Sequence, residues 1–118
     1  MVSMDAIGAR CFLIAGCAMT TEKNPSGDAA GERLDLSLCH LSGELSNSIG
    51  NLSNLSFLDL GGNNFSSIIP PRIGKLHKLQ YLGMGDCNLF GSIPQEIGML
   101  TNLELIDLSR NSFFRYHP

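Results

Sequence analysis

A repeat with a period of 24 residues occupies most of this chain. From Leu34 onward, successive segments align without gaps, as units 34–57, 58–81 and 82–105 and a partial unit 106–118. A fixed period of this length is typical of repeat arrays, in which one unit cannot bury its own apolar face and must stack on its neighbours. The sequence therefore predicts a stack of equivalent coils around one shared core.

Each unit opens with two large apolar residues two positions apart, as in Leu58 and Leu60. Alternate residues of an extended chain lie on the same face, so this spacing predicts a short strand that directs both side chains inward. Equivalent strands one period apart run in the same direction and can pair as a parallel sheet. Pro70 and Pro94 cannot donate to a strand ladder, which predicts a return turn or a sheet edge there. The aligned apolar columns are Leu34/Leu58/Leu82/Ile106, Leu36/Leu60/Met84/Leu108, Leu41/Phe65/Leu89/Phe113, Leu45/Ile69/Ile93, Ile49/Ile73/Ile97, Leu52/Leu76/Leu100 and Leu55/Leu79/Leu103.

One inward column alternates between cysteine and asparagine, as Cys39, Asn63, Cys87 and Asn111. An inward asparagine can satisfy backbone groups of neighbouring turns with its side-chain amide, and cysteine tolerates burial well. Cys39 and Cys87 lie two strand spacings apart, about 10 Å, which is beyond the roughly 7 Å reach of a disulfide. We expect both to be free, buried thiols.

These columns resemble a known repeat pattern, LxxLxxLxLxxNxLxGxIPxxIGxL. The segments LSFLDLGGNNFSSIIPPRIGKLHKLQYL and GSIPQEIGMLTNLELIDLSRNSF follow it closely. The pattern is that of the plant-specific leucine-rich repeat, found in the ectodomains of plant leucine-rich repeat receptor-like kinases. The resemblance implies an α/β repeat fold: a short solenoid with a parallel β-sheet on the concave face and 3₁₀ or irregular turns on the convex face. The chain departs from the pattern at Ser46, Ser67, Arg115 and His117.

The resemblance also implies a function. Such ectodomains bind protein or peptide ligands, with a co-receptor as a further partner, in cell-surface signalling at an extracellular or plasma-membrane location. Family members usually carry a cysteine-paired N-terminal cap with tryptophan, a membrane helix and a kinase domain, none of which we find here, so we interpret the chain as a fragment without enzymatic activity. The alternatives are a small secreted inhibitor of a cell-wall-degrading enzyme and a non-functional truncated gene product.

Residues 1–33 fall outside the repeats and read as a leader and flexible linker. Arg10 precedes a short apolar stretch, and the small residues Gly16 and Ala18 have the spacing of a cleavage site. Residues 1–18 are therefore a weak secretory signal or, alternatively, a leader with no targeting role. The repeats would form a second region, 34–118.

The composition excludes several classes of function. Eight Lys and Arg against eleven Asp and Glu give a net charge of -3, which argues against nucleic-acid binding as the main task. The chain has no apolar run near the roughly 20 residues that cross a bilayer. No CxxC or HxxxH spacing is present, so we expect no metal site, and no motif suggests a cofactor.

Strand residues between the inward leucines should face the concave surface. Acidic and aromatic side chains recur there, beside Arg33 and Leu105. They could dock an extended peptide; alternatively, they are common filler residues of the repeat. The acidic residues lie on an open, solvated face and not in a cleft, so they do not form a catalytic pair. The candidate binding residues are Asp35, Phe57, Asp59, Tyr81 and Asp107.

Three sites fit the N-x-[ST] pattern for N-linked glycosylation: Asn51, Asn54 and Asn64. They matter only if the chain enters the secretory pathway.

Overall fold

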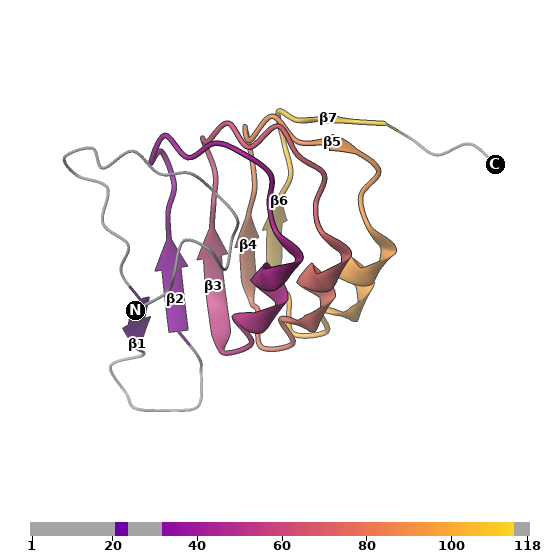
Figure 1. The fold of residues 1–118 in the computed structure, drawn as a ribbon. Helices are drawn as coiled ribbons and strands as arrows, with labels where there is room; N and C mark the ends of the chain where they lie inside the picture. The colour runs from indigo at the N-terminus through magenta and orange to yellow at the C-terminus, as the bar shows by residue number, and fades with distance from the viewer. Residues whose placement is uncertain (1–20, 24–31, 115–118) are drawn as a thin grey trace.

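The computed structural model describes residues 21–23 and 32–114, in which equivalent coils of the chain are stacked side by side (Figure 1). The main sheet has the strand order β1-β2-β3-β4-β6. Its strands are β1 (Thr21–Lys23), β2 (Glu32–Asp35), β3 (Leu55–Asp59), β4 (Tyr81–Gly83) and β6 (Leu105–Asp107).

The register of this sheet confirms the 24-residue period. Strands β2, β3, β4 and β6 pair in parallel, with Leu34 opposite Leu58, Leu58 opposite Leu82, and Leu82 opposite Ile106. The first three of these side chains are fully buried. Residues 24 apart are therefore direct neighbours on adjacent strands, and their side chains enter the same core.

The other side of each coil is a short 3₁₀ turn (Figure 1). These turns are η2 (Asn47–Asn51), η3 (Pro71–Lys75) and η4 (Gln95–Met99). Pro70 and Pro94 precede the second and third turns with φ of -62° and -67°, so both prolines lie at return turns, as predicted. Ser46 holds the same position before η2, where its side chain accepts a hydrogen bond from the Ser48 N–H. The predicted solenoid, with a parallel sheet on one face and 3₁₀ turns on the other, is confirmed.

A second, smaller sheet was not predicted. It joins β5 (Phe90–Gly91) to β7 (Ser112–Phe113) in parallel, and a bridge between Ser42 and Asn64 continues the same kind of contact between the first two coils. These segments run from the main sheet towards the 3₁₀ turns (Figure 1). Neighbouring coils are thus hydrogen-bonded along two lines rather than one.

Burial decreases towards the C-terminal end of the described stack. A Cβ atom at Gly50 or Gly74 would lie 2.8 Å from a backbone oxygen of the following coil, whereas nothing lies within 4 Å of that position at Gly98. Leu45 and Ile69 are buried, as predicted, but Ile93 in the same column is 48% exposed. The prediction for Ile93 is wrong because no described coil packs beyond it.

Part of the predicted linker is a strand. Thr21–Lys23 forms β1, which pairs antiparallel with β2. The predicted leader 1–18, the remaining linker residues 24–31, and the departures from the repeat pattern at Arg115 and His117 lie outside the described residues. The division at Leu34 stays a prediction.

The two cysteines of the mixed column differ. Cys87 is a free, buried thiol, as predicted, and donates to the Leu60 carbonyl oxygen at 3.0 Å. The prediction for Cys39 is wrong, because this residue is disulfide-bonded. The distance of about 10 Å across two strands excludes only Cys87 as the partner of Cys39. Cys87 is indeed free.

Candidate functional site

The five candidate binding residues lie on the sheet face opposite the core. Strand alternation places them there, because Leu34, Leu58 and Leu82 point the other way. Phe57 pairs with Tyr81, and Asp35 with Asp59, on adjacent strands. Asp107 pairs with Gly83. The concave face therefore carries an aromatic row and, beside it, an acidic row that glycine interrupts.

The aromatic row is a continuous stack. The rings of Phe57 and Tyr81 lie 4.6 Å apart with 14° between their planes, and the guanidinium carbon of Arg33 lies 4.0 Å from the Phe57 centroid. In-register residues on parallel strands are about 4.8 Å apart, so equivalent aromatic rings stack almost face to face. Leu105 continues the row and is 60% exposed. The row forms an amphipathic shelf across four strands.

Each carboxylate of the acidic row is oriented by hydrogen bonds from the residue two positions later in the chain. Asp35 accepts hydrogen bonds from the N–H and hydroxyl of Ser37, and Asp59 accepts from the Gly61 N–H at 2.9 Å. Asp107 accepts from the N–H and hydroxyl of Ser109, and these bonds lower its pKa. In each case Oδ1 is the bonded oxygen, which leaves Oδ2 available to a ligand.

Two glycines on this face, Gly83 and Gly85, leave space that neighbouring side chains occupy. A Cβ atom at Gly83 would lie 2.7 Å from Asp59 Oδ1 and 2.8 Å from the Tyr81 hydroxyl oxygen. A Cβ atom at Gly85 would lie 2.9 Å from Asp107 Oδ2. Oxygen atoms from both neighbouring strands therefore lean over the glycine backbone, where a larger residue would exclude them.

The side chains that cover these two glycines were not predicted from the sequence. Their signal was present in the alignment: Gly83 interrupts an otherwise acidic column, and Gly85 stands where the first and fourth units have serine. Sequence alone did not show that the flanking carboxylates turn towards these gaps, because that depends on the turn hydrogen bonds of each aspartate.

The charges of the acidic row act on the neighbouring Tyr81. Burial, followed by the charges of Asp59, Asp107 and Asp35, raises the pKa of Tyr81, so its hydroxyl remains a neutral donor. Among residues 21–23 and 32–114, no group of three or more His, Cys, Asp or Glu side chains is arranged to hold a metal ion. What the face offers is oriented acceptors beside stacked rings.

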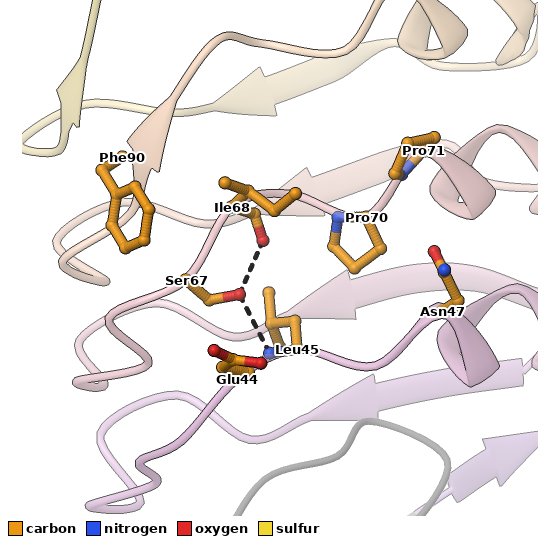
Figure 2. A pocket seen from close by; sticks show the side chains of 8 residues that line it. All are labelled: Glu44, Leu45, Asn47, Ser67, Ile68, Pro70, Pro71 and Phe90. Carbon is orange, nitrogen blue, oxygen red and sulfur yellow. Dashed lines mark hydrogen bonds between the residues drawn. The ribbon is translucent and has the colours of Figure 1, made fainter.

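A separate groove of about 360 Å³ lies on the side of the solenoid (Figure 2). Phe90 stands at one end and Pro71 at the other, with Ile68 and Pro70 between them. Ser67, in the place of the glycine of the repeat pattern, accepts a hydrogen bond from the Leu45 N–H and donates one to the Ile68 carbonyl oxygen. The groove is open and mostly apolar, with Glu44 and Asn47 also in its lining, and it was not predicted from the sequence.

The three predicted glycosylation sites are all exposed. Asn51 ends η2. The side-chain oxygen of Asn54 accepts a hydrogen bond from Lys78 at 2.8 Å, and that of Asn64 accepts one from Asn88 at 2.9 Å. An N-linked glycan is attached to the side-chain nitrogen, so the accepting oxygens of Asn54 and Asn64 would keep these inter-coil hydrogen bonds. No such bond involves the Asn51 side chain in the described part of the chain.

Within the described ranges, no helix is both long and apolar enough to cross a membrane.

Comparison with known families places the repeats in a defined class. The Leucine Rich Repeat family model matches residues 32–52, 54–76 and 78–100, which is more than half of the chain. A putative leucine-rich repeat receptor-like serine/threonine-protein kinase of Arabidopsis thaliana is 53% identical over 45 residues, covering 38% of this chain. The match covers only 5% of that kinase.

Solved structures agree with this assignment. The ectodomain of the Arabidopsis receptor kinase HAESA, in complex with an N-terminally extended IDA peptide hormone ligand, is 40% identical, covers 69% of this chain, and superimposes with a TM-score of 0.66. The plant peptide hormone receptor RGFR1, in complex with RGF2, is 28% identical, covers 83% of this chain, and has a TM-score of 0.68. This chain spans 14% and 18% of those two structures.

Proposed function

Because this chain belongs to the leucine-rich repeat family, we propose that it is a protein- or peptide-binding module that captures an extended peptide on its concave face. The stack of Arg33, Phe57 and Tyr81 beside oriented carboxylates is the observation that carries this proposal. Exposed aromatic rings supply contact area at a low cost in conformational entropy, and the adjacent acceptors supply direction.

The related receptors support the choice of ligand class. HAESA and RGFR1 were each solved with a peptide hormone bound. By analogy, this chain acts through binding alone and performs no catalysis, at an extracellular or plasma-membrane location, and belongs with the ligand-binding part of a receptor-like kinase. A co-receptor is a further partner. In that setting Asn51, Asn54 and Asn64 are candidate glycan acceptors.

A peptide-display experiment tests this proposal. The immobilised chain is challenged with a random nonapeptide library, in parallel with a variant that carries both Phe57→Ser and Tyr81→Ser. We expect the original chain to retain peptides and the double variant to lose at least about 90% of them. Circular dichroism spectra of the two proteins should coincide, because both side chains lie outside the core.

The proposal fails if the double variant, still folded, retains the same peptides as the original chain. Retention would then depend on another surface, such as the groove beside Ile68 and Phe90.

A further inference from the structure

A polar pocket of about 360 Å³, which we call the turn pocket, lies beyond the C-terminal ends of the main-sheet strands. Two columns of the repeat line it, represented by His40, Asn64, Asn88 and Ser112 and by Asp86 and Arg110. None of the five candidate binding residues of the concave face is in its lining. Taking the extracellular setting of the proposed function as its basis, we propose that the turn pocket holds the first N-acetylglucosamine of a glycan attached to Asn64.

Asn64 supplies the attachment point. It opens the segment Asn64-Phe65-Ser66, which fits the acceptor pattern, and its side chain is exposed. Its Oδ1 accepts a hydrogen bond from Asn88 Nδ2 at 2.9 Å, whereas its own Nδ2 donates no hydrogen bond within the described part of the chain. A glycan bonds to Nδ2, so the link to Asn88 stays in place and keeps the amide fixed. Because Asn64 itself lines the turn pocket, the first sugar begins there.

The glycan comes from a lipid-linked oligosaccharide donor of the secretory pathway. Asn64 Nδ2 attacks C1 of the first sugar, the bond from C1 to the lipid diphosphate breaks, and the amide nitrogen loses one proton. The lipid diphosphate is the leaving group, and no oxidant or reductant is needed. The sugar then lies in the turn pocket once the surrounding turns have folded.

The lining of the turn pocket suits a neutral sugar better than an ion. Asp86 and Arg110 bring opposite charges to it, and among the described residues neither side chain forms an ion pair or a hydrogen bond. The Ser112 hydroxyl and the His40 ring are likewise without a hydrogen-bond partner there. The hydroxyl and acetamido groups of N-acetylglucosamine both donate and accept, so they can replace water on donors and acceptors alike.

The other two acceptor sites lie in a different environment. Asn51 and Asn54 line a smaller cavity, of about 160 Å³, together with Leu52 and Leu55. Glu32 is the charged residue of that lining. A sugar on Asn51 or Asn54 therefore meets fewer polar side chains than one on Asn64, and we expect it to project into solvent.

The test measures how easily the glycan on Asn64 is released. The full chain, with a signal peptide placed before Met1, is produced in insect cells and purified from medium and microsomes. Peptide N-glycosidase cuts between asparagine and the first sugar and converts the asparagine to aspartate, which mass spectrometry follows at Asn64. The original chain is compared with the double variant Asp86→Gly with Arg110→Gly, and with the control Leu38→Gly.

These substitutions are matched in backbone conformation. Leu38, Asp86 and Arg110 share one column of the repeat and have φ of 53°, 54° and 56°, which glycine adopts without strain. Leu38 does not line the turn pocket, whereas the other two do. Gly62 already occupies this column in the second repeat, so we expect all three proteins to fold and to give coincident circular dichroism spectra.

In the native proteins, we expect release from Asn64 to be at least about tenfold slower in the original chain and in Leu38→Gly than in the double variant, because the enzyme acts only while the sugar is out of the pocket. After denaturation, the three proteins should release the glycan at the same rate.

Equal native rates in the original chain and the double variant would overturn the inference, and so would an Asn64 that carries no glycan in either fraction. Both results leave the proposed function intact, because peptide retention on the concave face is measured with chain produced in bacteria, without glycans. Loss of retention there would contradict the proposed function alone.

Discussion

Between the first and second repeats an asparagine side chain both accepts and donates hydrogen bonds, whereas at the equivalent position between the second and third repeats a cysteine side chain only donates and a backbone carbonyl is the acceptor. Asn63 accepts from the N–H groups of Cys39 and Leu41 and donates to the carbonyl oxygens of Leu36 and Leu60. At the next junction, where the column holds Cys87, the Phe65 N–H donates to the Cys87 carbonyl oxygen at 3.1 Å. A thiol cannot accept two N–H bonds in the way an amide oxygen does.

This difference extends into the conformation of the turns. In the first and third repeats, which each precede an asparagine, His40 and Asn88 have positive φ of 56° and 54°. In the second repeat, which precedes Cys87, the equivalent Asn64 has no positive φ, and the conformation occurs two residues later in the period, at Ser66. The path of the turn therefore changes together with the residue in the mixed column and with Ser67, which replaces the positive-φ glycine found at Gly43 and Gly91. A solenoid of near-identical repeats therefore contains two kinds of junction.

The largest effect is expected from Asn63→Leu. Leucine has a similar volume but no acceptor, so the N–H groups of Cys39 and Leu41 would be left buried without partners. Each such group costs about 1 to 3 kcal/mol, and we expect a loss of about 3 kcal/mol or more from the free energy of unfolding. Urea unfolding followed by circular dichroism measures it.

The control for this variant is Asn64→Ala, which removes an exposed amide and its bond to Asn88. Its cost should stay below about 1 kcal/mol. Similar costs for both variants would show that the buried amide is not what holds the first junction.

A smaller effect is expected from Ser67→Ala, at the second difference between the repeats. Ser67 is 3% exposed and supplies the acceptor for the Leu45 N–H. Its removal should cost about 1 to 2 kcal/mol in urea unfolding. The exposed Ser92 serves as the matched control, and a Ser92→Ala variant as destabilised as Ser67→Ala would contradict the assignment.

The third prediction, Asn111→Leu, tests whether the cost of losing these hydrogen bonds depends on how deeply the asparagine is buried. Asn111 makes the same bonds as Asn63, to the N–H groups of Cys87 and Leu89 and to the Met84 and Leu108 carbonyl oxygens, but it is only half-buried. Water can replace part of the lost acceptor, so we expect a cost of about 1 kcal/mol. A loss as large as that of Asn63→Leu in the same urea assay would show that burial does not set the difference.

The smallest effect is a pH dependence at the cysteine junction. Burial raises the pKa of the Cys87 thiol above its ordinary value of 9.0. Above that ordinary value the unfolded thiol loses its proton before the folded one, so the stabilising contribution is complete below about pH 8 and declines as the pH rises through 9. Urea unfolding at pH 8 and pH 9.5 should show a lower free energy of unfolding at the higher pH.

Cys87→Ala provides the control, since Tyr81 titrates at higher pH in both proteins. The variant should show a smaller decline between the two pH values. An equal decline in the free energy of unfolding in both proteins would mean that Cys87 does not cause the pH dependence.

The candidate binding face shows how far sequence reasoning can go. Alternation along the strands was enough to place Asp35, Phe57, Asp59, Tyr81 and Asp107 on one face, because direction alternates strictly with position in an extended chain. It could not show that Asp59 and Asp107 lie over Gly83 and Gly85, since the inclination of each carboxylate depends on hydrogen bonds in its own turn.

By itself, the sequence determined the period, the register and the buried columns of this protein. These follow from spacing alone: side chains 24 apart meet whenever equal coils stack, whatever the details of each turn. Only the tertiary structure decided which turns are left-handed, that Cys39 is disulfide-bonded, and that Ile93 is exposed. Each of those features depends on what lies in the neighbouring coil or elsewhere in the chain, and contacts of that kind are not visible in the spacing of one repeat.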